Sequence, residues 1–94
     1  MADSARPPDP LARAVALLES GAWQEAHAIV QEERSELAAW LHGIVHTIEG
    51  DLENARYWYR RARRAFPGPE AAGTEIAHAR RALESGAGRA KEKT

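Results

Sequence analysis

The 94-residue sequence contains no cysteine, and this absence removes a whole class of chemistry. Without thiols the chain can form no disulfide, no thiolate zinc site and no cysteine nucleophile. The sequence therefore gives no indication that the protein resides in an oxidising compartment. We therefore expect a cytoplasmic protein.

Long apolar runs are also missing, since no stretch approaches the roughly 18 apolar residues of a membrane-spanning helix. The first ten residues are polar and proline-rich, unlike a signal peptide. We expect neither export nor a membrane partner.

The net charge is only -1, from 13 Lys and Arg against 14 Asp and Glu. No global field would attract nucleic acid, so an electrostatic function requires a local patch.

The composition that remains is that of an ordinary globular domain, with 44% hydrophobic and 29% charged residues. The length leaves room for one domain with one modest core. No alternating β-branched run is present, which argues against a sheet. We expect a single helical domain over residues 9–84, with flexible tails at 1–8 and 85–94.

Apolar residues recur at helical spacing in five segments of the chain. The segments are separated by turn residues, among them Ser20-Gly21, Gly50-Asp51 and Pro67-Gly68-Pro69. Because the connections are short, successive helices should lie antiparallel. The predicted helices cover about 11–20, 22–30, 35–49, 52–66 and 70–83. The last carries few large apolar residues and is typical of a capping helix.

An internal repeat relates residues 21–26 to residues 50–55. The second copy resembles the tetratricopeptide repeat, which has a small residue on its first helix and Ala-x3-aromatic, then proline, on its second. The matching residues are Gly43, Ala55, Tyr59 and Pro67. Gly43 and Ala55 would let two helices approach closely, with Tyr59 beside them. The resemblance implies an all-α fold of antiparallel helical hairpins that binds a protein or peptide.

The chain departs from this family at His42 and His46, where the repeat usually has large apolar residues. The string His-x3-His-x2-Glu-Gly-Asp-x2-Asn-Ala-x-Tyr-Trp, residues 42–58, is also similar to a stretch of small bacterial proteins of unknown activity. That similarity implies no function. At about 100° per residue, His42, His46 and Glu49 share a narrow arc of one helix.

Two histidines at positions i and i+4 can share a divalent metal such as zinc. Glu49 is then a candidate third ligand, and His27 a fourth if its helix faces the same crevice. The alternative is that the histidines lie on a wet helical face or bond Asn54 or Tyr59. The string is not the zinc-protease His-Glu-x2-His motif and no nucleophile accompanies it. We therefore expect no cofactor and no enzyme, with a metal site as the alternative.

An apolar stripe runs along the other side of the same predicted helix. If the family alignment holds, the stripe faces the concave side and forms a peptide groove or a homodimer face. If not, the first two helices bury it as core. Two repeats and a cap fall short of the about three units that a repeat array needs, which favours self-association. The stripe residues predicted to contact a partner are Leu37, Trp40, Leu41 and Ile44.

The predicted helix over 52–66 carries five arginines interleaved with aromatic residues. Such a patch can bind RNA or an acidic partner. We favour a solvated charged face instead, because arginine is a good helix former and acidic residues lie nearby. The sequence thus predicts a non-enzymatic protein-interaction module rather than a nucleic-acid-binding protein. Its predicted contact residues on this helix are Tyr57, Trp58, Arg60 and Arg61.

Overall fold

The computed structural model describes residues 9–85, and within them it contains five α-helices, one 3-10 helix and no strand. The prediction of an all-α fold with about five helices is confirmed. In this part of the chain, no helix has the length and apolar character to cross a membrane. The predicted tails lie outside the described residues, apart from Ser85, which caps the last helix. The elements are α1 (Pro10–Glu19), α2 (Trp23–Val30), α3 (Glu36–Glu49), α4 (Leu52–Arg61), η2 (Pro69–Ala71) and α5 (Ala72–Glu84).

Local capping explains where three of the helices begin. The side chains of Asp9, Ser35 and Asp51 accept hydrogen bonds from backbone N–H groups in the first turns of α1, α3 and α4. Each satisfies a donor that has no partner within its helix. Gly50 ends α3 with a φ of 93°, a conformation that glycine adopts at little cost. The turn residues visible in the sequence therefore fix these boundaries.

The α4 helix is shorter than predicted and ends at Arg61 rather than near residue 66. Arg63 adopts a left-handed conformation with a φ of 64°, and the Arg64 N–H donates to the Tyr59 carbonyl at 3.0 Å. This bond satisfies a terminal carbonyl and stops the helix. Phe66 still packs on Tyr59, with ring centroids 5.3 Å apart. The spacing of Phe66 from the earlier apolar residues therefore reflects its burial and not a continuation of the helix.

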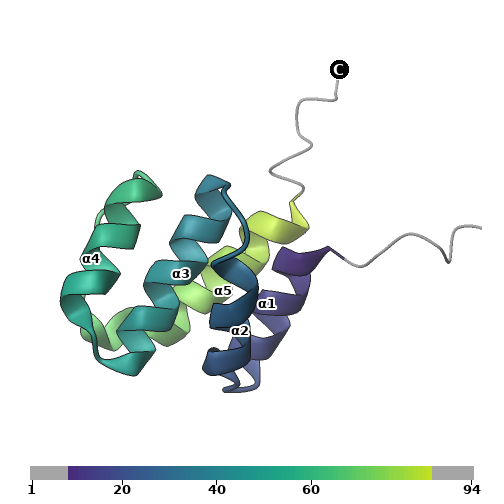
Figure 1. Ribbon diagram of the computed structural model, residues 1–94, viewed down its shortest axis with the longest axis horizontal. Coiled ribbons are helices and arrows are strands. Elements are labelled where there is room, and N and C mark those ends of the chain that lie inside the picture. The colour runs from purple at the N-terminus through teal and green to yellow at the C-terminus, as the bar shows by residue number, and fades with distance from the viewer. Residues whose placement is uncertain (1–8, 86–94) are drawn as a thin grey trace, which may run out of the picture.

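The α3 helix lies at the centre of the molecule and contacts all four other α-helices (Figure 1). After the Gly50-Asp51 connection, α4 lies beside α3 on one side, and α2 lies on the other. The α5 helix passes behind α3 and also contacts α1. Every residue from 38 to 47 is therefore buried. The structure covers α3 on both of its faces.

Of the two alternatives expected for the apolar stripe, the structure supports burial in the core of this chain. Leu41 and Ile44 are 0% exposed, Trp40 is 4% exposed and Leu37 is half-buried. The stripe joins side chains of α1, α2 and α5 in one apolar cluster. Its buried members therefore pack against other side chains of the same chain.

The close approach predicted at Gly43 is confirmed. A Cβ atom placed on Gly43 would lie 2.5 Å from Tyr59 Cδ1 and 3.3 Å from the Ala55 carbonyl oxygen. The first of these distances is far inside van der Waals contact. Gly43 therefore lets α3 and α4 approach closely, with Tyr59 against Gly43 and Trp58 against the neighbouring His42.

Candidate metal centre

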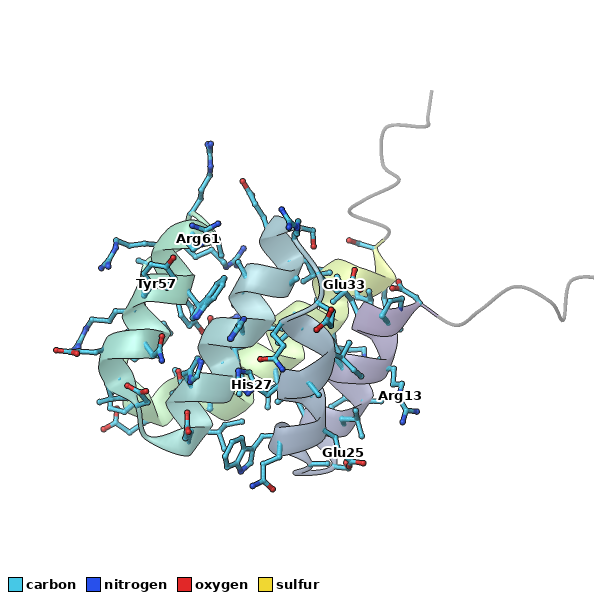
Figure 2. All side chains as sticks on the ribbon, viewed as in Figure 1. Arg13, Glu25, His27, Glu33, Tyr57 and Arg61 are labelled. Atoms are coloured by element: carbon cyan, nitrogen blue, oxygen red, sulfur yellow. The ribbon has the colours of Figure 1, made fainter. Side chains whose placement is uncertain are left out.

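Three of the four histidines gather where α2 contacts α3. Figure 2 labels one of them, His27. His42 and His46 lie one turn apart on α3, and His27 comes from α2. His42 is 5% exposed, His46 is 7% exposed and His27 is half-buried. The ring centroids are 4.8 Å apart for His27 and His42, and 5.0 Å apart for the other two pairs. One potential ligand atom from each residue lies within 4.8 Å of the others. We call this group the histidine cluster.

His27 and His42 face each other through the same ring nitrogen. Their Nε2 atoms are 3.1 Å apart, a hydrogen-bond distance at which one nitrogen donates and the other accepts. Burial and the neighbouring His27 lower the pKa of His42 to about 4. Burial and the neighbouring His46 also lower the pKa of His27. Both rings are therefore neutral near pH 7, the form in which imidazole binds a metal.

His46 is oriented by Glu49 one turn later on the same helix. The Nδ1 atom of His46 lies 2.7 Å from Glu49 Oε1, so an N–H on Nδ1 donates to the carboxylate. This tautomer leaves the lone pair of Nε2 free for the cluster. A carboxylate that holds the far nitrogen of a histidine is a regular feature of metal sites. Glu49, predicted as a ligand, here contacts His46 and also lies within 4.8 Å of ligand atoms of His46 and Asp51, while His27 is the third member of the histidine cluster.

Trp58 of α4 covers the cluster from the side opposite α2. Its ring stacks on the His42 ring with centroids 3.9 Å apart and an angle of 7° between the planes. The stacking fixes the plane of the His42 ring and lowers its access to water. The sequence predicts Trp58 as a partner contact, and its stacking on His42 is a finding of the structure. Trp58 belongs to the same sequence string as His42 and His46, and this is the feature from which its position beside them could have been predicted.

The alternative partners predicted for these histidines bond elsewhere. Asn54 donates to Asp51 at 3.1 Å within the first turn of α4. The hydroxyl of Tyr59 donates to Glu75 Oε1 at 2.7 Å, and the indole N–H of Trp40 donates to the same oxygen at 3.0 Å. Glu75 is a buried carboxylate that sequence reasoning missed, because a lone acidic residue on a polar helix carries no signal of burial.

Three of the five arginines on α4 and just after it lie over aromatic rings. Arg56 lies over the ring of Phe66, Arg61 lies near Tyr57 and Trp58, and Arg64 lies 3.5 Å over the ring of Trp40. Each guanidinium is thus directed to a different aromatic group. Of the residues predicted to contact a partner, Tyr57, Arg60 and Arg61 are exposed and Trp58 is half-buried (Figure 2 labels Tyr57 and Arg61).

Comparisons with known protein families, with curated proteins and with solved structures found no match. The resemblance to tetratricopeptide repeats therefore stays a prediction, and function is argued from the site itself.

Proposed function

We propose that this chain binds a divalent transition metal, with zinc as the representative ion, through His27, His42 and His46. The observation that carries the proposal is the convergence of three buried or half-buried imidazoles from two helices, one of them oriented by a carboxylate. Histidines in such clusters are the usual ligands of zinc, copper and nickel, whereas magnesium and calcium take oxygen ligands.

The spacing of the cluster suits tetrahedral coordination. With zinc–nitrogen bonds of about 2.0–2.1 Å, neighbouring ligand nitrogens lie about 3.3 Å apart. The Nε2 atoms of His27 and His42 are already 3.1 Å apart, and the third ligand atom is within 4.8 Å of both. For both Nε2 lone pairs to face a metal, the ring that carries its proton on Nε2 must take the other tautomer, with the proton on Nδ1, and both rings then stay neutral.

The protein-interaction module predicted from the sequence stays a prediction and is not the proposal favoured here. Half of its predicted contact residues lie on the stripe that the core of the chain contains. The histidine cluster, in contrast, brings three potential ligand atoms of one chain within 4.8 Å of one another. A metal site therefore uses residues that the fold brings together, whereas the module would keep only its exposed contact residues on α4 and the end of that helix.

The test is a zinc titration of tag-free protein after dialysis against a chelator, followed by calorimetry with magnesium as the negative control. We expect one zinc per chain, no response to magnesium, and an affinity at least about 100-fold lower in His27→Ala and His42→Ala. His78→Ala is the matched control, because His78 lies on α5, half-exposed and outside the cluster. Glu49→Gln should weaken binding by about 10- to 100-fold. Equal zinc affinity in wild type and His27→Ala would refute the site.

A further inference from the structure

A pocket of about 360 Å³ lies where α5 and the turn after α4 meet the N-terminal half of α3. We call it the α5 pocket. Its volume is typical of sites that hold a small molecule. None of its lining residues belongs to the histidine cluster, so the two places can act independently. The lining residues are Trp40, Arg64, His78, Arg81, Ala82 and Ser85.

The lining of the α5 pocket is basic. It contains two guanidinium groups and one imidazole, and it contains no carboxylate. Within residues 9–85, the arginines that form ion pairs are Arg63 and Arg80, and neither of them lines this pocket. Glu84, close to Arg81 in sequence, lies 3.9 Å from Arg80 instead. Arg64 and Arg81 therefore bring two positive charges to the pocket that no carboxylate of the described residues pairs with.

Trp40 holds the side chain of Arg64 in place. The Cζ atom of Arg64 lies 3.5 Å from the centroid of the Trp40 ring, so the guanidinium rests on the indole. This contact engages the flat face of the guanidinium and leaves the N–H groups at its edge to donate. Trp40 is 4% exposed and its indole N–H donates to Glu75, which fixes the ring beneath Arg64. Arg64 is thus already ordered before a ligand binds, which lowers the entropy cost of binding.

His78 and Arg81 lie about one turn apart on α5 and therefore share one side of that helix. The Nδ1 atom of His78 lies 3.4 Å from Glu75 Oε2, which turns this nitrogen toward the protein. The Nε2 atom, on the opposite side of the ring, is the one that can donate to an occupant. Glu75 does not line the pocket, and its other oxygen accepts from Tyr59 and Trp40 in the core.

The remaining lining is apolar or already hydrogen-bonded. Trp40 and Ala82 supply hydrocarbon surface. At the end of α5, the Ser85 N–H donates to the Arg81 carbonyl and the Ser85 hydroxyl donates to the Ala82 carbonyl, both at 2.9 Å. These bonds reduce the partial negative charge that a helix C-terminus presents to an anion. The α5 pocket therefore suits an occupant with an anionic head and a compact apolar body.

We propose that the α5 pocket binds a small organic phosphate, a phosphate monoester with a compact apolar body. The head accepts hydrogen bonds from Arg64, Arg81 and His78, and the body lies against Trp40 and Ala82. A phosphate ester carries nearly two negative charges at neutral pH and presents three oxygens, which matches two guanidinium groups and an imidazole better than a carboxylate does. The proposal rests on these residues alone and not on the metal site.

The experiment titrates three probes into the full chain by calorimetry, in phosphate-free buffer of low salt. Phenyl phosphate has both the head and the body, phenyl sulfate has nearly the same shape with one charge fewer, and inorganic phosphate lacks the ring. We expect phenyl phosphate to bind at least about 10-fold more tightly than phenyl sulfate, because hydrogen bonds from guanidinium groups strengthen with the charge of the acceptor. It should also bind more tightly than inorganic phosphate, which lacks the apolar contact.

Substitutions locate the binding. Arg81→Gln and Arg64→Gln should each lower the affinity for phenyl phosphate by at least about 10-fold, through the loss of charged hydrogen bonds. Arg60→Gln is the matched control, because Arg60 is an exposed arginine of α4 that does not line the pocket. His78→Ala should weaken phenyl phosphate and leave zinc binding intact, whereas His27→Ala should do the reverse. This last pair separates the α5 pocket from the histidine cluster.

The outcomes that would overturn the proposal are distinct. If phenyl phosphate does not bind, or binds no more tightly than phenyl sulfate, the phosphate site is refuted whatever the zinc titration shows. Full affinity in Arg81→Gln would place the binding elsewhere on the chain. An equal loss in Arg60→Gln would reduce the effect to net charge and refute the site as well. Equal affinity for inorganic phosphate would overturn the role of the apolar surface. Far-ultraviolet circular dichroism confirms that each variant is folded.

Discussion

At the scale of a single residue, Gly43 sets the distance between α3 and α4. A methyl group at this position would overlap the Tyr59 ring, which is fully buried and cannot move aside freely. We predict that Gly43→Ala lowers the free energy of unfolding by about 1–3 kcal/mol, the usual cost of overpacking, despite the better helix propensity of alanine. Urea unfolding monitored by circular dichroism measures this loss.

Gly73 provides the matched control for this substitution. It also lies within a helix, α5, but a Cβ atom there would meet nothing within 4 Å. Gly73→Ala should therefore raise stability by about 0.5–1 kcal/mol, because alanine loses less backbone entropy on folding. If both variants changed stability in the same direction, the close contact between Gly43 and Tyr59 would have no energetic weight.

The lowered pKa of His42 predicts how the metal-free protein responds to acid. The folded pKa is about 4, against an ordinary value of 6.5, so folding disfavours the protonated ring. The stabilisation is complete above pH 6.5 and is lost as pH falls from about 6.5 to about 4. The difference between these two pKa values corresponds to on the order of 3 kcal/mol in the free energy of unfolding. His27, whose pKa is lowered as well, acts in the same direction.

The measurement is urea unfolding in the presence of a chelator at several pH values across this window. His42→Gln removes the titrating ring, so we expect most of the pH dependence above pH 4.5 to disappear in that variant. Carboxylates whose pKa is lowered, such as Glu75, contribute only at lower pH. An unchanged slope in His42→Gln would show that the ring is not desolvated in the fold.

The residues of the candidate site differ in how far the sequence could predict them. His42 and His46 were found because both lie on one helix, where spacing alone places them together. His27 was named on the condition that its helix faced them, which only the packing of α2 on α3 decides. The stacking of Trp58 on His42 and the role of Glu49 depend on rotamers. No sequence pattern specifies those.

At the scale of an element, α5 is held by polar anchors as much as by apolar contacts. Glu75 accepts from Trp40 of α3 and Tyr59 of α4, and Arg80 makes two hydrogen bonds to Glu19 of α1. Burial alone would raise the pKa of Glu75, but the hydrogen bonds from Tyr59, Trp40 and His78 lower it overall. The carboxylate is therefore charged near pH 7 and accepts strongly.

We predict that Glu75→Ala lowers stability by about 2–4 kcal/mol, because it leaves two buried donors without an acceptor. Glu75→Gln keeps one oxygen in place and should lose no more than about half as much. Hydrogen exchange of the α5 amides should quicken in Glu75→Ala before that of α3. Equal losses in the two variants would indicate that shape rather than hydrogen bonding matters at this position.

The helices themselves were predictable because their signals are local. Caps such as Ser35 and breaks such as Gly50 act within one turn, and the apolar spacing follows the helical period. The burial of the apolar stripe around Leu41 could not be predicted in the same way. It depends on where α5 packs after the Pro67-Gly68-Pro69 break. The residue that anchors this packing is the charged Glu75.

At the scale of the whole molecule, the proposed metal connects the successive helices α2 and α3, and through them the helices that each packs against. His27 lies on α2, which follows α1, while His42 and His46 lie on α3, which packs on α4. A ligand that binds only the folded state stabilises it by about 2.7 kcal/mol when its concentration is 100 times the dissociation constant. For a domain of this size that is a rise of about 10–20 °C in Tm.

Because the metal bridges α2 and α3, its effect should depend on having ligands from both helices. We predict that saturating zinc raises the Tm of the wild type and slows hydrogen exchange throughout α2. In His27→Ala the ion keeps only ligands on α3, so zinc should shift Tm by a few degrees at most and leave α2 exchange unchanged. His78→Ala should respond as the wild type does. A full Tm shift in His27→Ala would mean that zinc binds α3 alone, and the bridge between the two parts of the chain would then be wrong.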